Sequence, residues 1–367
     1  MNIIKINRET LLEPLGAVSG IIERRHTLPI LSNVLLERNG TDITIVATDI
    51  EIQISARAVC ETPGEAKAIT VTARKLLEIL RALPEQSEVT LALQEKKLQV
   101  KAAKSRFNLQ TLPAEDFPRL SLAEAASTKM TLPQKVLKQL FLSVQYAMAQ
   151  QDIRYYLNGL LLVTGGDKIT VVATDGHRLA MASAAHKIDG VQEVILPRKT
   201  ILELSKLMSD GDDPVEVELS PTQARFSFGS IVLISKLVDG KFPDYTRVIP
   251  TTHNKKLLLN RIVLLQALQR AAILTNEKFK GVRWVLVEGS LKIICSNNEQ
   301  EEAQEEIDVT YSGDALDIGF NVNYLQDVLN NLDCGEIECA LGDANSSALI
   351  TVPGNENFKY VVMPMRI

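Results

Sequence analysis

The residue types that could carry out chemistry are concentrated in one short run, Thr174-Asp175-Gly176-His177-Arg178. A carboxylate and an imidazole so close in sequence suggest general acid–base catalysis, as in a hydrolase that uses Asp175 and His177. The same run is also typical of a turn between two strands, because Gly tolerates a positive φ. The usual phosphate-loop, dinucleotide-binding, serine-hydrolase and zinc-protease motifs do not occur. We therefore predict a binding pocket here and keep the hydrolase as an alternative.

The turn itself is repeated along the chain. Thr48-Asp49-Ile50-Glu51 and Ser296-Asn297-Asn298-Glu299 stand in equivalent settings, each about 120 residues from the middle copy. The histidine occurs in the middle copy only, so the turn does not need it. A side chain that only one copy carries is a candidate for function rather than for folding.

Two further markers repeat in the same order and at the same spacing. The first occupies residues 72–80, 196–204 and 321–329, and the second occupies residues 116–118, 241–245 and 358–360. A period of about 120 residues is far longer than a solenoid repeat of roughly 20–50 residues, so each copy should hold its own core. We predict three tandem domains with boundaries at 1–125, 128–249 and 250–367.

Local patterns within the copies predict an α+β fold. Apolar residues at 11–18 and 136–144 are spaced for one face of a helix, and the first marker supplies a second helix in each copy. Runs such as 43–47, 50–54 and 89–93 alternate as β-strands do. Each domain should therefore contain two helices and antiparallel sheets.

Composition fits an ordinary protein of the cytoplasm. Hydrophobic residues make up 46% of the chain and charged residues 23%, which is enough for three cores. The first residues lack a signal-peptide pattern, and no apolar run is long enough for a membrane span. Cys60, Cys295, Cys334 and Cys339 lack the spacing of zinc or redox motifs. We expect a cytoplasmic protein without membrane contact, metal or cofactor.

Five segments of the chain, in register, closely resemble the bacterial sliding clamps, the β subunits of DNA polymerase III. They are QDIRYYLNG at 151–159, ATDGHRLA at 173–180, SKLVDGKFPDY at 235–245, AILTNEKFKG at 272–281 and YVVMPMRI at 360–367. The resemblance extends over the whole chain and its three-domain order. It implies a non-catalytic processivity subunit for DNA replication.

The resemblance also implies an architecture and a set of partners. Family members form a head-to-tail ring dimer with pseudo-sixfold symmetry, which encircles duplex DNA without reading its sequence. Short clamp-binding peptides attach the polymerase III alpha subunit, the clamp loader, other polymerases and mismatch-repair proteins to the ring. A peptide-binding scaffold that never engages DNA is the alternative from another class.

Simple geometry supports a ring of two chains. A domain of about 120 residues has a diameter of roughly 35 Å. Three touching spheres of that size leave a hole of about 5 Å, whereas six leave roughly 35 Å, and a duplex is about 20 Å across. One chain cannot enclose DNA, but two chains related by a twofold axis can.

The resemblance assigns a peptide pocket between the second and third domains. Methionine and leucine side chains adapt to varied apolar partners, while arginine and backbone groups can fix a peptide's direction. The matching positions are Leu157, Thr174, Gly176, His177, Arg178, Leu179, Pro243, Arg247, Val248, Asn321, Tyr324, Ser347, Val361, Met363, Pro364, Met365 and Arg366.

The net charge of −5 is unusual for a protein that binds DNA. A ring that is topologically trapped needs no tight contact, and strong phosphate binding would hinder sliding. By resemblance, the family's DNA contacts correspond to Arg25, Gln151, Tyr155 and Tyr156.

The two ends of the chain carry the residues that match the family's dimer contact. Alternation places Phe107 and Leu109 on one face of a strand, and an acidic stretch begins at Glu299. Without the resemblance, a solvated charge run beside core residues would be the simpler interpretation. The full set is Lys75, Arg106, Phe107 and Leu109 in the first domain, with Ile273, Leu274, Glu299, Glu301, Glu302 and Glu305 in the third.

Overall fold

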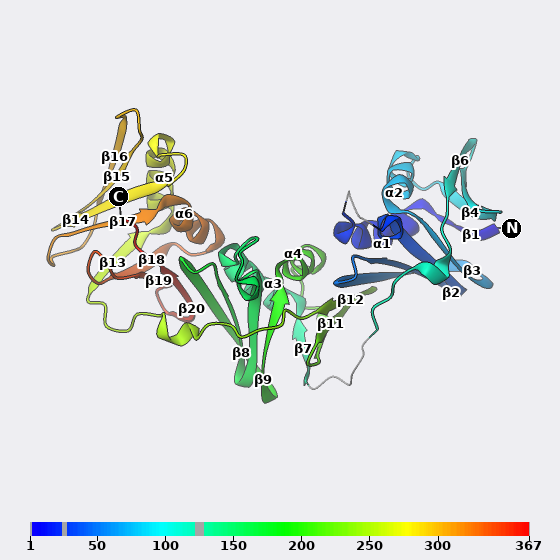
Figure 1. The fold of residues 1–367 in the computed structure, drawn as a ribbon, viewed down its shortest axis with the longest axis horizontal. Helices are drawn as coiled ribbons and strands as arrows, with labels where there is room; N and C mark the ends of the chain where they lie inside the picture. The colour runs from blue at the N-terminus through cyan, green and yellow to red at the C-terminus, as the bar shows by residue number, and fades with distance from the viewer. Residues whose placement is uncertain (1, 24–27, 122–127, 367) are drawn as a thin grey trace. The chain divides into compact units, whose positions relative to one another are not determined.

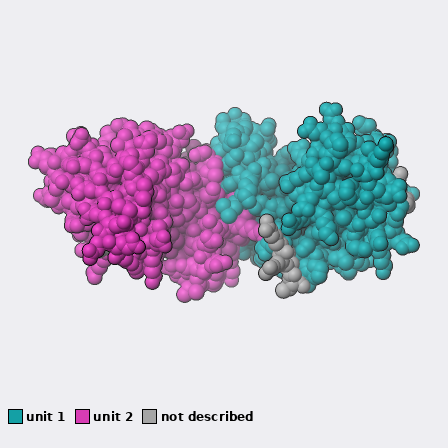
Figure 2. Space-filling view, turned by 90° about the horizontal axis from the view of Figure 1, so that it is seen from above, with its two compact units in different colours: residues 1–138, 202–237 teal, residues 139–201, 238–367 magenta. Residues whose placement is uncertain are grey.

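The computed structural model describes residues 2–23, 28–121 and 128–366, and its elements are labelled in Figure 1. The chain folds into two compact units, coloured separately in Figure 2. Unit 1 comprises residues 1–138 and 202–237, and unit 2 comprises residues 139–201 and 238–367. The division falls within the second predicted copy, whose strands belong to both units.

Unit 1 contains two antiparallel sheets. The four-stranded sheet has the order β1-β4-β5-β6, and the six-stranded sheet has the order β2-β3-β12-β11-β10-β7. Their strands are β1 (Asn2–Asn7), β2 (Asn33–Thr48), β3 (Ile52–Thr72), β4 (Glu88–Gln94), β5 (Lys97–Ala102), β6 (Ser105–Gln110), β7 (Thr128–Pro133), β10 (Pro214–Leu219), β11 (Gln223–Phe228) and β12 (Ile231–Lys236).

Unit 2 repeats this arrangement. Its six-stranded sheet has the order β13-β18-β19-β20-β9-β8, and its four-stranded sheet has the order β16-β15-β14-β17. Their strands are β8 (Gly159–Thr174), β9 (Arg178–Pro197), β13 (Lys255–Asn260), β14 (Gly281–Val287), β15 (Ser290–Ser296), β16 (Glu302–Asp308), β17 (Leu316–Asn321), β18 (Glu336–Leu341), β19 (Ala348–Val352) and β20 (Asn355–Val362).

Two α-helices per copy are present in the described residues, as the sequence predicted. They are α1 (Arg8–Val18), α2 (Ala73–Ala82), α3 (Gln134–Val144), α4 (Arg198–Leu207), α5 (Arg261–Ala271) and α6 (Val322–Asn331). Asparagine side chains at residues 7, 260 and 321 accept a backbone N–H in the first turn of α1, α5 and α6. Such caps satisfy donors that a helix start otherwise leaves open.

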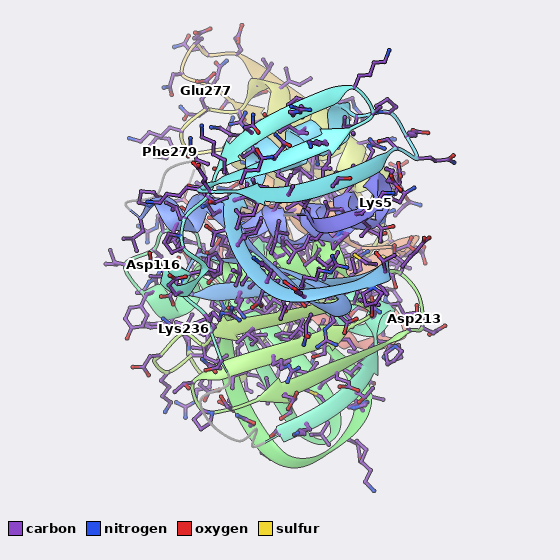
Figure 3. All side chains as sticks on the ribbon, turned by 90° about the vertical axis from the view of Figure 1, so that its right-hand side faces the viewer. Lys5, Asp116, Asp213, Lys236, Glu277 and Phe279 are labelled. Atoms are coloured by element: carbon purple, nitrogen blue, oxygen red, sulfur yellow. The ribbon has the colours of Figure 1, made fainter. Side chains whose placement is uncertain are left out.

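The cores lie where helices cover the sheets. In unit 1, α1 packs against β3 and α2, and its Leu11, Leu15 and Val18 are fully buried. Charged side chains remain at the surface, such as Lys5 of β1 and Lys236 of β12, both labelled in Figure 3. No helix in the described part of the chain is both long enough and apolar enough to span a membrane.

Strands pair across the boundaries of the predicted copies. In unit 1, β12 of the second copy pairs with β3 of the first, with Ser235 opposite Ile52. In unit 2, β20 of the third copy pairs with β9 of the second, with Val361 opposite Leu179. Each six-stranded sheet is therefore built by two copies.

A glycine with positive φ interrupts the sheet at the same point of each copy. Gly40 and Gly166, with φ of 64° and 62°, lie where the long hairpins β2–β3 and β8–β9 shift register. In the third copy Gly289, with φ of 72°, forms the turn between β14 and β15. Only glycine adopts this backbone region without strain, so the three residues mark the bend that all copies need.

One detail of the predicted strands is wrong. Ile50 was expected within an alternating run, but it lies in the turn between β2 and β3 with φ of 71°. It occupies the turn position that Gly176 takes in the second copy, because Thr48 and Asp49 hold the backbone there through side-chain hydrogen bonds.

Candidate functional site

The turn between β8 and β9 is closed by its own side chains. The Thr174 hydroxyl donates to the Arg178 carbonyl at 2.6 Å and accepts from the Gly176 N–H at 3.1 Å. The Asp175 carboxylate accepts the N–H groups of His177 and Arg178 at 2.9 and 3.1 Å. Thr and Asp are therefore needed to fold the turn, as they are in the first copy.

This geometry argues against acid–base chemistry by Asp175 and His177. One Asp175 oxygen accepts two backbone N–H groups, and the other accepts the Arg178 Nε–H at 3.0 Å. The His177 ring instead stacks on Tyr324, with 6.5 Å between ring centroids. The carboxylate shapes the turn, and the imidazole lies on an aromatic surface.

An apolar cluster lies below the turn. Its buried members include Leu157, Leu179 and Val361, which come from η5 (Tyr155–Leu157), β9 and β20. Phe242 is buried in the same cluster, and Tyr245 and Ile249 pack against it. Residues predicted for the peptide pocket are thus joined by packing although they lie far apart in the sequence.

Two exposed apolar side chains lie within two residues of Val361 and Ile249 in the sequence. Met363 is 47% exposed and Val248 is 45% exposed. The Met363 N–H donates to the His177 carbonyl at 2.9 Å, and the Met365 N–H donates to the Gly319 carbonyl at 2.8 Å. These bonds hold the end of the chain against the turn and against β17. A flexible methionine is consequently presented beside a rigid turn, which suits binding of varied apolar groups.

Arg178 is the most heavily engaged charged residue of the turn. Its guanidinium donates to Asp175, to Asp327 of α6 at 2.6 Å, and to the Tyr146 carbonyl at 2.5 Å. It also lies over the Tyr324 ring, with its central carbon 4.4 Å from the ring centroid. The side chain is 9% exposed. It therefore ties α6 to the turn and has few donors left for a peptide.

The surroundings of Arg178 favour its charge. Burial alone would lower the pKa of the guanidinium, but the carboxylates of Asp327 and Asp175 favour the cation, and the net result is a raised pKa. Burial raises the pKa of the Tyr360 phenol, and that of the neighbouring Tyr146 phenol. The cation is accordingly fixed, while the phenols stay neutral.

A polar cavity of about 310 Å³ adjoins the turn on the side of residues 146–152. Arg198 at the start of α4 lines it together with Arg178 and His177, and donates to the Met148 carbonyl at 3.2 Å. Burial, and then the charge of Arg178, lower the pKa of Arg198.

The other predicted pocket residues lie on four segments of unit 2. Pro243, Arg247 and Val248 belong to the segment around η6 (Tyr245–Arg247), where Arg247 pairs with Asp244 at 2.9 Å. Asn321 and Tyr324 lie at the start of α6, and Ser347 precedes β19. Pro364, Met365 and Arg366 follow β20.

The predicted DNA contacts Gln151, Tyr155 and Tyr156 share one loop. Gln151 has φ of 56°, and the two tyrosine rings meet edge to face at 5.8 Å. Tyr155 is 56% exposed, whereas Tyr156 packs against the apolar cluster. Arg25 lies outside the described residues.

Asp152 and Arg154 fix the shape of this loop. The Arg154 guanidinium donates to both Asp152 oxygens and to the Asp175 carbonyl at 3.1 Å. The side-chain bond from Arg154, and then its backbone N–H, lower the pKa of Asp152 to about 2. The loop is thereby tied to the turn that carries His177.

Five of the ten predicted dimer residues lie on edge strands of the two four-stranded sheets. Phe107, Arg106 and Leu109 belong to β6, an edge strand, and Leu109 is already buried within unit 1. Glu302 and Glu305 belong to β16, the edge strand of the other sheet. Figure 1 shows both strands at the margins of their sheets.

Next to β16, the short helix η7 (Ala272–Leu274) exposes an apolar side chain. Ile273 is 77% exposed and, with Leu274, Glu299 and Glu301, lines a cavity of about 430 Å³. Glu277 and Phe279, labelled in Figure 3, follow on the adjoining loop. Lys75 lies in the first turn of α2.

Sequence reasoning missed the partners that hold these residues in place. Asp327, which binds Arg178, was not singled out, and neither was Tyr146. A signal was available: the sixth residue of α2, α4 and α6 is acidic in every copy, at Glu78, Glu203 and Asp327.

Comparison with solved structures defines the class of fold. The sliding clamp of Pseudomonas aeruginosa, crystallised with a ligand, superposes with a TM-score of 0.96 at 46% identity and full coverage of both chains. The polymerase III β protein of Caulobacter crescentus gives a TM-score of 0.93 at 38% identity, again with full coverage. The chain therefore has the three-domain clamp fold.

Sequence comparison gives the same result. Models of the N-terminal, central and C-terminal domains of the DNA polymerase III beta subunit match residues 1–121, 131–244 and 246–366. The beta sliding clamps of Pseudomonas putida and Escherichia coli K12 are 47% and 45% identical over 364 residues, or 99% of each chain.

The chain belongs to the bacterial beta sliding clamp family, the β subunit of DNA polymerase III. Its function is that of a DNA sliding clamp, a non-catalytic subunit that confers processivity in DNA replication. DNA and DNA polymerase III are the partners that the family implies.

Proposed function

We propose that the chain acts as a head-to-tail homodimer that encircles duplex DNA and carries a peptide site on each chain. The proposed users of the site are the polymerase III alpha subunit, the clamp loader, other polymerases and mismatch-repair proteins. We place this activity in the cytoplasm, with the chromosome. We also propose domain boundaries at 1–125, 128–249 and 250–367, which the extents of the three family matches support within a few residues.

One observation carries the peptide site. Exposed Met363 follows Val361 of the buried cluster by two residues, and exposed Val248 directly precedes Ile249, which packs against that cluster. Apolar side chains left at the surface beside a formed core favour an apolar ligand, since their burial would contribute about 25 cal/mol per Å². The fixed turn at 174–178 offers backbone groups beside them, so a short peptide could be held in one direction.

Dimerisation is supported by the free sheet edges. Because β6 and β16 are both edge strands, pairing one with the other in a second chain would satisfy their open backbone groups. The first domain supplies the cations Lys75 and Arg106, and the third supplies the acidic residues in and before β16. The charges are complementary, which favours this register over pairing of like edges.

The DNA contact is supported by the loop at 151–156. Its polar and aromatic side chains can touch a phosphate backbone without reading bases, as a sliding protein requires. The internal bonds of Asp152 and Arg154 keep the loop in shape, so little ordering cost is expected on binding.

Loading on circular DNA tests the ring. The purified protein, loaded by a clamp loader onto nicked circular DNA, should remain bound through gel filtration and dissociate once the circle is cut. Retention that does not depend on circularity would contradict encirclement, and peptide binding without any loading would favour the DNA-independent scaffold.

Peptide titration tests the site. Removing residues 363–367 deletes Met363 and the segment that Gly319 holds, so a fluorescent polymerase-derived peptide should lose about 2 kcal/mol or more of binding free energy. His177→Ala should cost less, because its ring only lines the site. The P. aeruginosa clamp has been crystallised bound to griselimycin, and we expect griselimycin to bind this chain as well. Unchanged peptide affinity in a folded, dimeric truncation would contradict the assignment.

A further inference from the structure

We propose that His253 is a positioning residue for the peptide site, an inference that rests on the proposed function. Its ring joins the segment that follows η6 to the loop at 342–347, between β18 and β19. Both segments border the apolar cluster of the site. The hydrogen bond between them thereby sets the distance between two walls of the peptide site.

The hydrogen bond shows which nitrogen of the His253 ring carries a proton. His253 Nε2 lies 2.6 Å from the Ser347 carbonyl oxygen. Because a carbonyl only accepts, Nε2 carries the proton and the histidine donates. Ser347 is one of the residues assigned to the peptide site, and its backbone is thus held by a residue outside that set.

Gly342 provides the space in which the ring lies. A Cβ atom at Gly342 would stand 2.8 Å from His253 Cε1 and 2.9 Å from Nδ1. Such distances are too short, so any larger residue would push the ring away from Ser347. The backbone of Gly342 is not in the positive-φ region, so the requirement for glycine here comes from its neighbours, first the His253 ring and then Ser346 Cβ at 3.1 Å.

The loop is rigid enough to transmit a shift. Asp343 accepts the Ser346 hydroxyl at 2.8 Å and the Asn345 N–H at 2.9 Å, and the Ser346 N–H donates to the Asp343 carbonyl. The Ser346 hydroxyl, followed by backbone N–H groups and more weakly by His253, lowers the pKa of Asp343. A loop closed in this way moves as one body, carrying Ser347 with it.

Packing connects both segments to the site. Ile249 precedes His253 by four residues, and Leu349 follows Ser347 by two. Each packs against the cluster that contains Leu179 and Val361. Without the His253 bond, the two segments would still touch the cluster, but the spacing between them would no longer be fixed.

Five variants test the proposal through peptide affinity. His253→Leu removes the donor while keeping bulk, whereas His253→Gln can place an amide N–H near the position of Nε2. Gly342→Ala leaves His253 in place but displaces its ring. We expect about fivefold weaker peptide binding for His253→Leu and for Gly342→Ala, and less than a twofold change for His253→Gln.

The remaining two variants, His253→Ala and the double variant His253→Ala/Gly342→Ala, complete a mutant cycle. With the ring removed in His253→Ala, the nearest remaining neighbour of the added methyl of Gly342→Ala is Ser346 Cβ, at 3.1 Å. The double variant should therefore bind peptide within about twofold of His253→Ala alone, because both changes remove one interaction. A general loss of packing would not leave the peptide affinity of His253→Gln nearly unchanged. Nor would it make the losses of affinity in the double variant non-additive.

The possible failures can be told apart. If the unaltered protein binds no polymerase-derived peptide, the proposed site is wrong and the role of His253 falls with it. If it binds but His253→Leu and Gly342→Ala bind equally well, only the positioning role is wrong. Additive losses in the double variant would also overturn it. Met363→Ala serves as the control that weakens binding directly, and thermal unfolding shows that each variant is folded.

Discussion

Replacing Asp327 by alanine should destabilise unit 2, because it leaves the Arg178 cation with one carboxylate instead of two. Arg178 is almost fully enclosed, and its bond to Asp327 is 2.6 Å long. Hydrogen bonds to charged groups contribute about 1.5–3 kcal/mol, and breaking a fully buried pair costs about 3–5 kcal/mol. The Asp327 side chain is 42% exposed, so water can replace part of the loss.

Two further facts reduce the expected loss of stability. Arg178 keeps Asp175 and the Tyr146 carbonyl, and alanine is a better helix former than aspartate by several tenths of a kcal/mol. We therefore expect the free energy of unfolding to fall by about 1.5 kcal/mol. For a unit of this size, that corresponds to a decrease of about 3–6 °C in Tm. Peptide affinity should fall a few-fold, since the turn at 174–178 loses its tie to α6.

The assay compares this ion pair with an exposed one. Lys256 and Glu338 pair at 3.0 Å with side chains 60% and 36% exposed, so Glu338→Ala should cost no more than about 1 kcal/mol. Urea unfolding of both variants, followed by tyrosine and tryptophan fluorescence, gives the two values. If Asp327→Ala is no less stable than Glu338→Ala, Arg178 does not depend on Asp327 as argued.

Three further outcomes are expected. Ile273→Ala should cost a few kcal/mol of dimer stability, by analogy with buried truncations, and should leave the stability of the monomer unchanged because the side chain is exposed there. Leu109→Ala should lower both the dimer stability and the monomer stability. Sedimentation at nanomolar concentration measures the first effect, and unfolding of the same samples measures the second. Tyr155→Ala should slow loading on DNA and spare peptide affinity, whereas equal loss of both would indicate misfolding. Because the pKa of Asp152 is lowered, the stability that its pairing with Arg154 contributes is fully present above the ordinary pKa of 3.8 and is lost as pH falls through about 2. A titration of the Asp152 carboxyl by NMR that shows an ordinary midpoint would contradict the pairing.

Much of the fold could be predicted because its signals are local. The Asp-Gly turn, the apolar periodicity of α1 and α3 and the threefold recurrence of the markers each lie within a few residues of sequence. The glycines at 40, 166 and 289 are also visible in the local sequence. The prediction did not use them, because a single glycine within a strand-like run is only weak evidence for a bend or a turn. The prediction placed Ile50 in a strand because β-branched residues such as isoleucine rarely adopt a positive φ.

The connections that hold the site together could not be predicted from such patterns. Arg178 and Asp327 are 149 residues apart, and His253 and Ser347 are 94 residues apart. Nothing in the local sequence of either partner specifies the other, because the pairing follows from which strands meet in the six-stranded sheet. The resemblance to sliding clamps supplied candidate residues for the site but not the residues that position them.

Because β3 pairs with β12, the six-stranded sheet of unit 1 is still incomplete when the ribosome has synthesised the first third of the chain. Ribosomes add about 5–20 residues per second, and β12 begins 159 residues after β3 ends, so β3 waits roughly 8–32 s for β12 to be synthesised. Throughout that interval its outer edge, from Ile52 to Ala56, presents unpaired backbone groups and apolar side chains. An open edge of this kind is a site for aggregation. A fragment ending near residue 125 would keep that edge permanently, so dissection of this protein for study should follow its sheets rather than its repeats.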